Sequence, residues 1–248
     1  MTLALSASWR GFLRSTTSHS RIAPRMTILR TCAYSTSTTA SSAGADGAAS
    51  ERTRKVALIL ASSRNPCNGA GIAAWLKPLI QQHLAPIPHT LEVITPNTPP
   101  LPLGSVVDGT FLPSQIKDPA LYSSAAVRQW STFVSSTDLF VFLTPEYNSG
   151  FPGELKNTLD HIYWEWCNKP AMIVAYGGGG GLRATAMLSG ILKVLRMRVV
   201  EKSVNIQLPM QYSAGDQKVP LSGPFPDFLE AQKAQVHAAV NEAKALLL

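Results

Sequence analysis

A polar loop with the sequence Pro-Glu-Tyr-Asn occupies residues 145–148, between an apolar run at 139–144 and a helical pattern that starts near Pro152. The short apolar run is typical of a buried strand, and Pro145 cannot continue a strand ladder. Pro152 is tolerated in the first turn of a helix, where its missing N–H costs nothing. The sequence therefore predicts a strand, an irregular loop and a helix. Ligands bind at such junctions in open α/β sheets, which makes this loop a candidate binding site.

The loop at residues 62–69 has the composition of a phosphate cradle and follows an apolar run at 56–61. The hydroxyls of Ser62 and Ser63, the guanidinium of Arg64 and the free N–H groups at the start of the next helix favour a bound anion. Taken alone, a Ser-Ser-Arg loop is also typical of plain surface, so both interpretations stay open at this point.

A run of five glycines at residues 177–181 follows the apolar run 171–176. Backbone without side chains can approach a flat ring closely and can adopt conformations closed to other residues. The alternative is a flexible linker, which is a poor connection between a buried strand and a helix. The glycine run is therefore a third candidate for contact with a ligand.

Apolar runs alternate with helical patterns along the chain, and these elements have to position the three loops. Strands are predicted at 56–61, 91–95, 139–144, 171–176 and 198–204, and helices at 70–84, 123–136, 182–195 and 227–248, with another helical pattern after residue 153. The alternation predicts an α/β fold, in which right-handed crossovers create a parallel sheet with helices on both faces. Residues 96–121 are rich in proline and predict a long surface loop.

The stretch TPEYNSGFPGELKNTLD, followed by HIYWEW and KPAMIVAYGG, resembles the signature of the NADPH-dependent FMN reductase and quinone reductase family of flavodoxin-like proteins. The resemblance covers residues 54–205 and implies a flavodoxin-like, five-stranded parallel sheet in the order 2-1-3-4-5. It also implies an NAD(P)H-dependent oxidoreductase, a flavoprotein with FMN and with NADPH or NADH as cofactors. Electrons would pass through flavin N5 to a small-molecule acceptor such as a quinone or free flavin.

The resemblance further implies which residues contact FMN. Ser62, Arg64 and Asn68 fall at the phosphate, although Ala61 stands where the family usually has glycine. The residues expected along the flavin ring are Pro145, Glu146, Tyr147, Asn148, Tyr176, Gly177, Gly178, Gly179 and Gly180, with Arg183 near the phosphate or the nicotinamide cofactor. No catalytic side chain is expected, because the cofactor carries the chemistry. The histidines and cysteines show no metal-ligand spacing, so no metal is expected either.

Two other classes of function stay open. An FMN-binding electron carrier or redox-sensing module would share the motif but turn over little NADPH. A flavin-free dehydrogenase would rest on residues 69–74, which match G-x-G-x-x-A, with Glu92 as a ribose-binding acid. The first glycine of that fingerprint should make the turn directly after the strand, whereas Gly69 stands eight residues beyond Ala61. We therefore interpret the dehydrogenase motif as a chance match.

Residues 1–50 differ in composition from the rest of the chain, with five Arg, no Lys and a single acid, Asp46. Arg-rich, Ser-rich and acid-poor composition predicts a mitochondrial transit peptide and linker, ahead of an FMN-binding domain at residues 51–248. The alternatives are a disordered tail or a translation start at Met26, either of which would leave the protein cytoplasmic. Without this segment the chain has 17 basic and 14 acidic residues, which argues against nucleic acid as a partner.

The aromatic residues Tyr163, Trp164 and Trp166 are dense enough to serve both a core and a partner surface. Members of the family commonly associate through the helix that follows residues 145–148, which we call the central loop. The resemblance therefore implies a homodimer, with pairing into a tetramer left open. No apolar run reaches the length of a membrane span.

Overall fold

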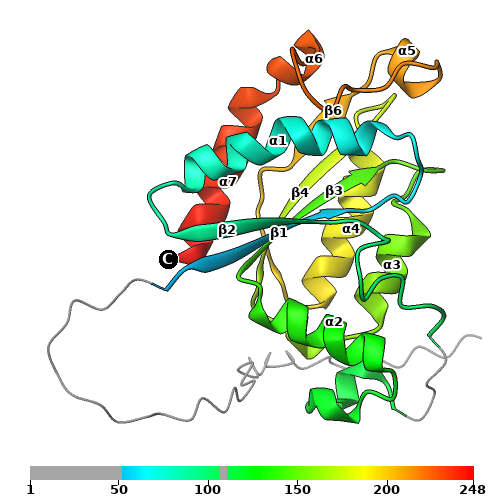
Figure 1. Cartoon of the computed structure of the whole chain (residues 1–248), viewed down its shortest axis with the longest axis vertical. Coiled ribbons are helices and arrows are strands. Elements are labelled where there is room, and N and C mark those ends of the chain that lie inside the picture. Colours follow the sequence, from blue (N-terminus) through cyan, green and yellow to red (C-terminus); the bar gives the residue numbers. More distant parts are fainter. Residues whose placement is uncertain (1–51, 107–110) are drawn as a thin grey trace, which may run out of the picture. The chain divides into compact units, whose positions relative to one another are not determined.

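A computed structural model describes residues 52–106 and 111–248, so the predicted presequence at 1–50 lies outside the described residues. The described part of the chain is built around a parallel sheet in the order β2-β1-β3-β4-β5, with β6 also paired to β4 (Figure 1). The strands are β1 (Arg54–Leu60), β2 (His89–Ile94), β3 (Leu139–Pro145), β4 (Pro170–Gly177), β5 (Arg198–Val199) and β6 (Val204–Gln207). Ile59 pairs with Phe142, and Phe142 with Ile173. The predicted strand order is confirmed.

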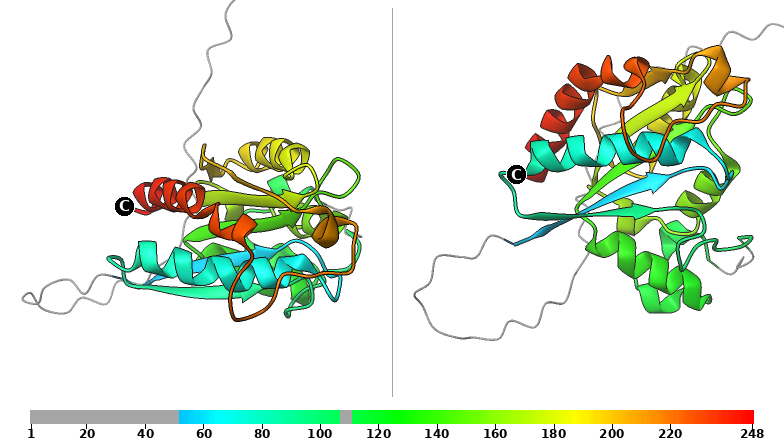
Figure 2. Two further views of the ribbon diagram at one scale, coloured as in Figure 1. Left: turned by 90° about the horizontal axis from the view of Figure 1, so that it is seen from above. Right: turned by 45° about the horizontal axis from the view of Figure 1, so that its top comes forward.

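Helices cover both faces of the sheet, as expected when parallel strands are joined by crossovers. They are α1 (Asn68–Leu84), α2 (Ala125–Ser136), α3 (Gly153–Asp160), α4 (Leu182–Val194), α5 (Met210–Ser213), α6 (Asp227–Glu230) and α7 (Lys233–Leu247). One core packs α1 and α7 against the sheet, and the other packs α2, α3 and α4 against its opposite face (Figure 2). Three short 3-10 helices, η1 (Pro113–Gln115), η2 (Pro119–Leu121) and η3 (Trp164–Trp166), complete the connections. Within the described part of the chain, no helix has the length and apolarity to cross a membrane.

Aromatic side chains fill the core beneath α2 and α3. Trp166 is fully buried and lies 5.1 Å from Phe140 and 6.1 Å from Trp130, measured between ring centroids. Trp164 instead lies at the surface, where Lys117 and Arg196 approach the faces of its ring. The predicted aromatic patch therefore divides between core packing and surface.

The strand predicted at 198–204 is divided into β5 and β6. The backbone N–H groups of Glu201 and Lys202 donate to the Glu242 carboxylate on α7, at 2.6 and 3.2 Å, instead of to a neighbouring strand. A side chain on a distant helix thus replaces the ladder for these residues, which sequence periodicity does not reveal. The helical pattern after the central loop continues to Trp166, but α3 ends at Asp160.

Candidate functional site

A cavity of about 440 Å³ opens at the carboxyl edge of the sheet, where the loops after β1, β3 and β4 meet. This is the topological switch point, because β1 and β3 are neighbours while their following crossovers lie on opposite faces. The lining residues are Arg64, Pro66, Cys67, Asn68, Pro145, Glu146, Tyr147, Asn148, Tyr176, Gly177, Gly178, Leu208, Tyr212, Ser213 and Lys218. Three predicted site residues, Ser62, Gly179 and Gly180, are not among them.

Tyr147 connects the central loop to the loop after β1. Its hydroxyl lies 2.8 Å from Ser62 Oγ, and the Arg64 guanidinium lies 4.1 Å from its ring centroid. Ser62 Oγ also accepts the N–H of Arg64 at 3.3 Å, so Ser62 supports the loop from behind the cavity. The central loop is a tight turn, in which Tyr147 and Gly150 exchange backbone hydrogen bonds of 2.8 and 2.9 Å. These contacts fix the phenol ring as one wall of the cavity.

Glu146 directs its carboxylate towards the start of α4. Oε2 accepts the backbone N–H of Arg183 at 3.0 Å and that of Ala184 at 3.5 Å, and the Arg183 guanidinium lies 4.0 Å from Oε1. An anion at a helix N-terminus is stabilised by unpaired N–H groups and by the helix dipole. Glu146 therefore joins the central loop to α4 and neutralises the anion-binding end of that helix with a protein carboxylate.

Arg183 was predicted to lie near the phosphate or the nicotinamide. Its guanidinium donates to Ser149 Oγ at 2.9 Å, its side chain is 72% exposed, and it does not line the cavity. The backbone N–H groups of Glu146 and Tyr147 bond to the carbonyl oxygens of Tyr176 and Gly150, at 2.9 and 2.8 Å. These two N–H groups are therefore already paired within the protein and are not available to a ligand.

Tyr176 is buried at the carboxyl end of β4 and reaches the first turn of α1. A Cβ at Gly69 would lie only 2.7 Å from its hydroxyl oxygen, so an alanine at this position would force the phenol to move. Burial raises the pKa of Tyr176 well above its usual value of 10, and the neighbouring Cys67 and Tyr147 raise the pKa further. The phenol therefore stays neutral and forms part of the cavity floor.

The part of the cavity lining around the start of α1 is positively charged. Cys67 is the N-cap of α1 but makes no capping hydrogen bond, and the first turn of α1 contains no acidic residue. Arg64 and Lys218 both line the cavity, and neither forms an ion pair with a carboxylate of residues 52–106 or 111–248. The N–H groups at the start of this helix, apart from that of Gly69, which bonds to the Tyr176 hydroxyl, form with the two cations a donor set that suits a phosphate group.

The side chain of Asn68 does not make the contacts expected of a residue that binds a phosphate. Its amide nitrogen donates to the Tyr212 carbonyl oxygen at 2.8 Å, and its side-chain oxygen accepts the N–H of Val219 at 3.0 Å. Both ends of the amide thus hold the segment after β6 against α1. Asn68 lines the cavity, but its side chain acts as a structural bridge.

Sequence reasoning missed the wall formed by Leu208, Tyr212, Ser213 and Lys218. These residues follow β6, whose carboxyl end lies at the same sheet edge as those of the other parallel strands. Ligands bind at the carboxyl ends of parallel strands, so these residues would have been predicted if the last strand had been predicted to continue to Gln207. Among the residues that the structure describes, no group of three His, Cys, Asp or Glu side chains could hold a metal ion.

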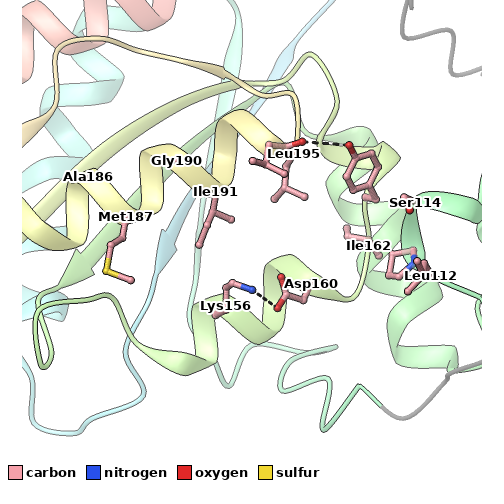
Figure 3. A pocket seen from close by; sticks show the side chains of 13 residues that line it. Leu112, Ser114, Lys156, Asp160, Ile162, Ala186, Met187, Gly190, Ile191 and Leu195 are labelled. Atoms are coloured by element: carbon pink, nitrogen blue, oxygen red, sulfur yellow. Dashed lines mark hydrogen bonds and ion pairs between the residues drawn. The ribbon is translucent and has the colours of Figure 1, made fainter. Parts of the chain in front are cut away.

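A second, apolar groove of about 640 Å³ lies between α3 and α4, away from the charged cavity (Figure 3). Met187 and Ile191 on α4 face Lys156 and Asp160 on α3, which form an ion pair with an N–O distance of 2.6 Å. Tyr163 closes one end by donating its hydroxyl to the Val194 carbonyl oxygen at 3.3 Å. The Lys156 ammonium group that lines this groove is paired with Asp160, and most of the other lining side chains are apolar.

The sheet order, and a cavity of this size at the β1 and β3 ends, define a flavodoxin-like α/β protein. The cavity lining combines two cations that form no ion pair within the described residues, an aromatic wall and side-chain-free glycine backbone, and this combination fits a flavin mononucleotide.

Comparison with known proteins identifies the family. The sequence model of the NADPH-dependent FMN reductase family matches residues 54–209. The chain is 37% identical over 158 residues to the NAD(P)H-dependent FMN reductase LOT6 of Saccharomyces cerevisiae, which covers 63% of this chain and 82% of that protein. It is 32% identical over 153 residues to the NAD(P)H-dependent FMN reductase ntnL of Nectria sp, covering 60% and 73% respectively.

Solved structures show the same fold at low sequence identity. The NAD(P)H:acceptor oxidoreductase FerB from Paracoccus denitrificans superposes with a TM-score of 0.54 at 20% identity, over 78% of this chain and 98% of that one. The chain belongs to the NADPH-dependent FMN reductase family. It is therefore an NAD(P)H-dependent oxidoreductase with FMN and a nicotinamide nucleotide as its cofactors.

Proposed function

We propose that the chain holds FMN in the cavity at the carboxyl edge of its sheet and delivers electrons from NADPH or NADH to a quinone, free flavin or similar small acceptor. The observation that supports this proposal is the composition of the cavity lining, which combines two cations, Arg64 and Lys218, with the aromatic ring of Tyr147 and the backbone of Gly177. A bound FMN supplies the redox chemistry, accepting a hydride and passing on electrons.

The residues of the chain would bind and orient the cofactor. The Arg64 guanidinium and the N–H groups at the start of α1 would hold the phosphate, because both are donors that border the same cavity. Tyr147 provides a flat apolar wall, and its contact with Ser62 keeps the ring plane fixed. Gly177 and Gly178 line the cavity with backbone that carries no side chain, which a ring can approach closely. Leu208 and Tyr212 exclude water from the side formed by the segment after β6.

Steady-state kinetics with NADPH and NADH, each against a quinone and against free flavin, tests the proposed reaction. Donor and acceptor would use one cavity in turn, so we expect parallel double-reciprocal lines, typical of a ping-pong mechanism. Rapid reduction of the flavin with no turnover of any small acceptor would favour an electron carrier with a protein partner. Failure of the chain to bind FMN would contradict the proposal as a whole.

Arg64→Met tests the position of the cofactor within the cavity. Loss of one charge-assisted contact should weaken FMN binding about tenfold or more. Arg183→Met is the matched control, since Arg183 is exposed and does not line the cavity. If both variants lose FMN equally, the phosphate does not lie where we propose.

We also propose that two copies associate through the groove between α3 and α4. Exposed apolar side chains flank this groove, with Met187 52% and Val194 70% exposed. A two-fold axis would place these side chains of each copy in the groove of the other, as an isologous interface requires. Light scattering after size exclusion should show a dimer for the chain and a monomer for Val194→Glu. Leu121→Glu, at an exposed apolar position outside the groove, should remain dimeric. A monomeric parent chain would contradict this proposal.

Mitochondrial import remains a proposal supported by the composition of residues 1–50. A fluorescent fusion of the full chain should enter mitochondria, while a fusion of residues 51–248 should stay in the cytoplasm. Identical distribution of the two fusions would contradict it.

A further inference from the structure

The segment between β6 and α6 is held against the first turn of α1 by three independent contacts. Both ends of the Asn68 amide bond to this segment, at 2.8 and 3.0 Å. A Cβ at Gly71 would lie 2.2 Å from the Val219 carbonyl oxygen, so the two backbones are in direct contact. Val219 is itself buried, with 3% exposure. Lys218 immediately precedes this anchor, so its backbone is fixed beside the uncapped N-terminus of α1.

Among the residues that the structure describes, the ammonium group of Lys218 has carbonyl partners and no carboxylate partner. Nζ donates to the Gly215 and Gln217 carbonyl oxygens at 3.3 and 3.0 Å. Since an ammonium group carries three donors, one remains for a ligand. Lys218 is half-buried and lines the same cavity as Arg64. Glu146 lines the same cavity, but its carboxylate accepts the N–H groups at the start of α4.

We propose that Lys218 is the second cation of the FMN phosphate site, opposite Arg64, and that it makes the chain select FMN over riboflavin. This inference rests on the proposed FMN site. A phosphate dianion between two cations and a helix N-terminus is stabilised by charge-assisted hydrogen bonds from each. The family match ends at residue 209, so this cation comes from a part of the chain outside the matched region.

Fluorescence titration of the flavin-free chain with FMN and with riboflavin tests the role of Lys218. Lys218→Gln should weaken FMN binding about tenfold or more and leave riboflavin binding unchanged, because only FMN carries the phosphate. Lys218→Arg should retain most of the FMN affinity. Lys202→Gln is the charge-matched control, since Lys202 is exposed and precedes β6, at the opposite edge of the sheet.

The other outcomes overturn the inference in distinguishable ways. Equal loss of FMN and riboflavin would show that Lys218 only shapes the segment. Unchanged FMN binding would exclude a contact with its phosphate, and a raised KM for NADPH but not NADH would assign the charge to the nicotinamide nucleotide. If the parent chain binds neither flavin, the proposed function itself fails.

Discussion

Gly69 and Tyr176 form a steric pair that connects the start of α1 to the end of β4, beneath the cavity. A Cβ at residue 69 would lie 2.7 Å from the tyrosine hydroxyl oxygen but 3.6 Å from the ring carbon that carries it. Gly69→Ala therefore forces the phenol to move, whereas removing the hydroxyl leaves an ordinary van der Waals contact. The pair can be tested with a double-mutant cycle.

The expected energies follow from this geometry. Overpacking lowers the free energy of unfolding by about 1–3 kcal/mol. Replacing a helical glycine by alanine raises it by up to about 1 kcal/mol. Gly69→Ala should thus lower the free energy of unfolding by about 1–2 kcal/mol. Tyr176→Phe alone should cost about 1 kcal/mol through loss of the buried hydroxyl's hydrogen bonding. In the Gly69→Ala background the same change should be neutral or stabilising, because it removes the clash.

Urea denaturation of the four proteins measures this coupling, and FMN titration provides a second readout. Since Tyr176 lines the cavity, Gly69→Ala should also weaken FMN binding, and Tyr176→Phe should restore it. If Tyr176→Phe costs the same free energy in both backgrounds, the phenol does not occupy the position described, and the reasoning about the cavity floor is refuted.

Three further predictions concern the segment after β6, the start of α4 and the contact of α1 with α7 at His83. Gly71→Ala places a Cβ 2.2 Å from a backbone carbonyl oxygen of the segment after α5, so FMN affinity should fall in titrations; unchanged affinity would show that the segment is not a cavity wall. Glu146→Ala should lower the unfolding free energy by about 1–2 kcal/mol through loss of the α4 cap. In the same urea experiment, Arg183→Met should cost less than about 0.5 kcal/mol because its ion pair is exposed; equal losses would refute the capping role. Burial, and then the charge of His237, lowers the pKa of His83 below 6.5. The unfolded chain then binds the proton more readily, so stability should fall as the pH drops below about 6.5. His83→Gln should flatten that part of the pH profile, and an unaltered profile would exclude His83.

The sheet was predictable because its strands are short, apolar and separated by helical patterns. Strand order came from the resemblance and agrees with the register of β1, β3 and β4. The division of the fifth strand was not predictable, because it depends on Glu242, a residue distant in sequence that takes the N–H groups of Glu201 and Lys202. Local patterns identify which residues can form a strand, but not which distant side chain competes for their hydrogen bonds.

The candidate site was predictable as a set of loops and less so as a set of contacts. Arg64 and Tyr147 line the cavity together, as their loops suggested. Glu146 and Asn68 also line it, but their side chains bind other parts of the protein. Side-chain direction depends on tertiary packing, which one sequence does not specify. Lys218 escaped notice because its loop has no motif and reaches the site only through the path of the chain after β6.

The central claim is that this cavity holds FMN where a nicotinamide nucleotide can reduce it. Anaerobic titration of the FMN-loaded chain with NADPH, followed through the visible absorbance of the flavin, tests that claim most directly. We expect the chain to retain FMN through gel filtration and its colour to bleach with one equivalent of NADPH. A chain that releases FMN, or whose bound flavin stays oxidised in excess NADPH and NADH, would contradict the account.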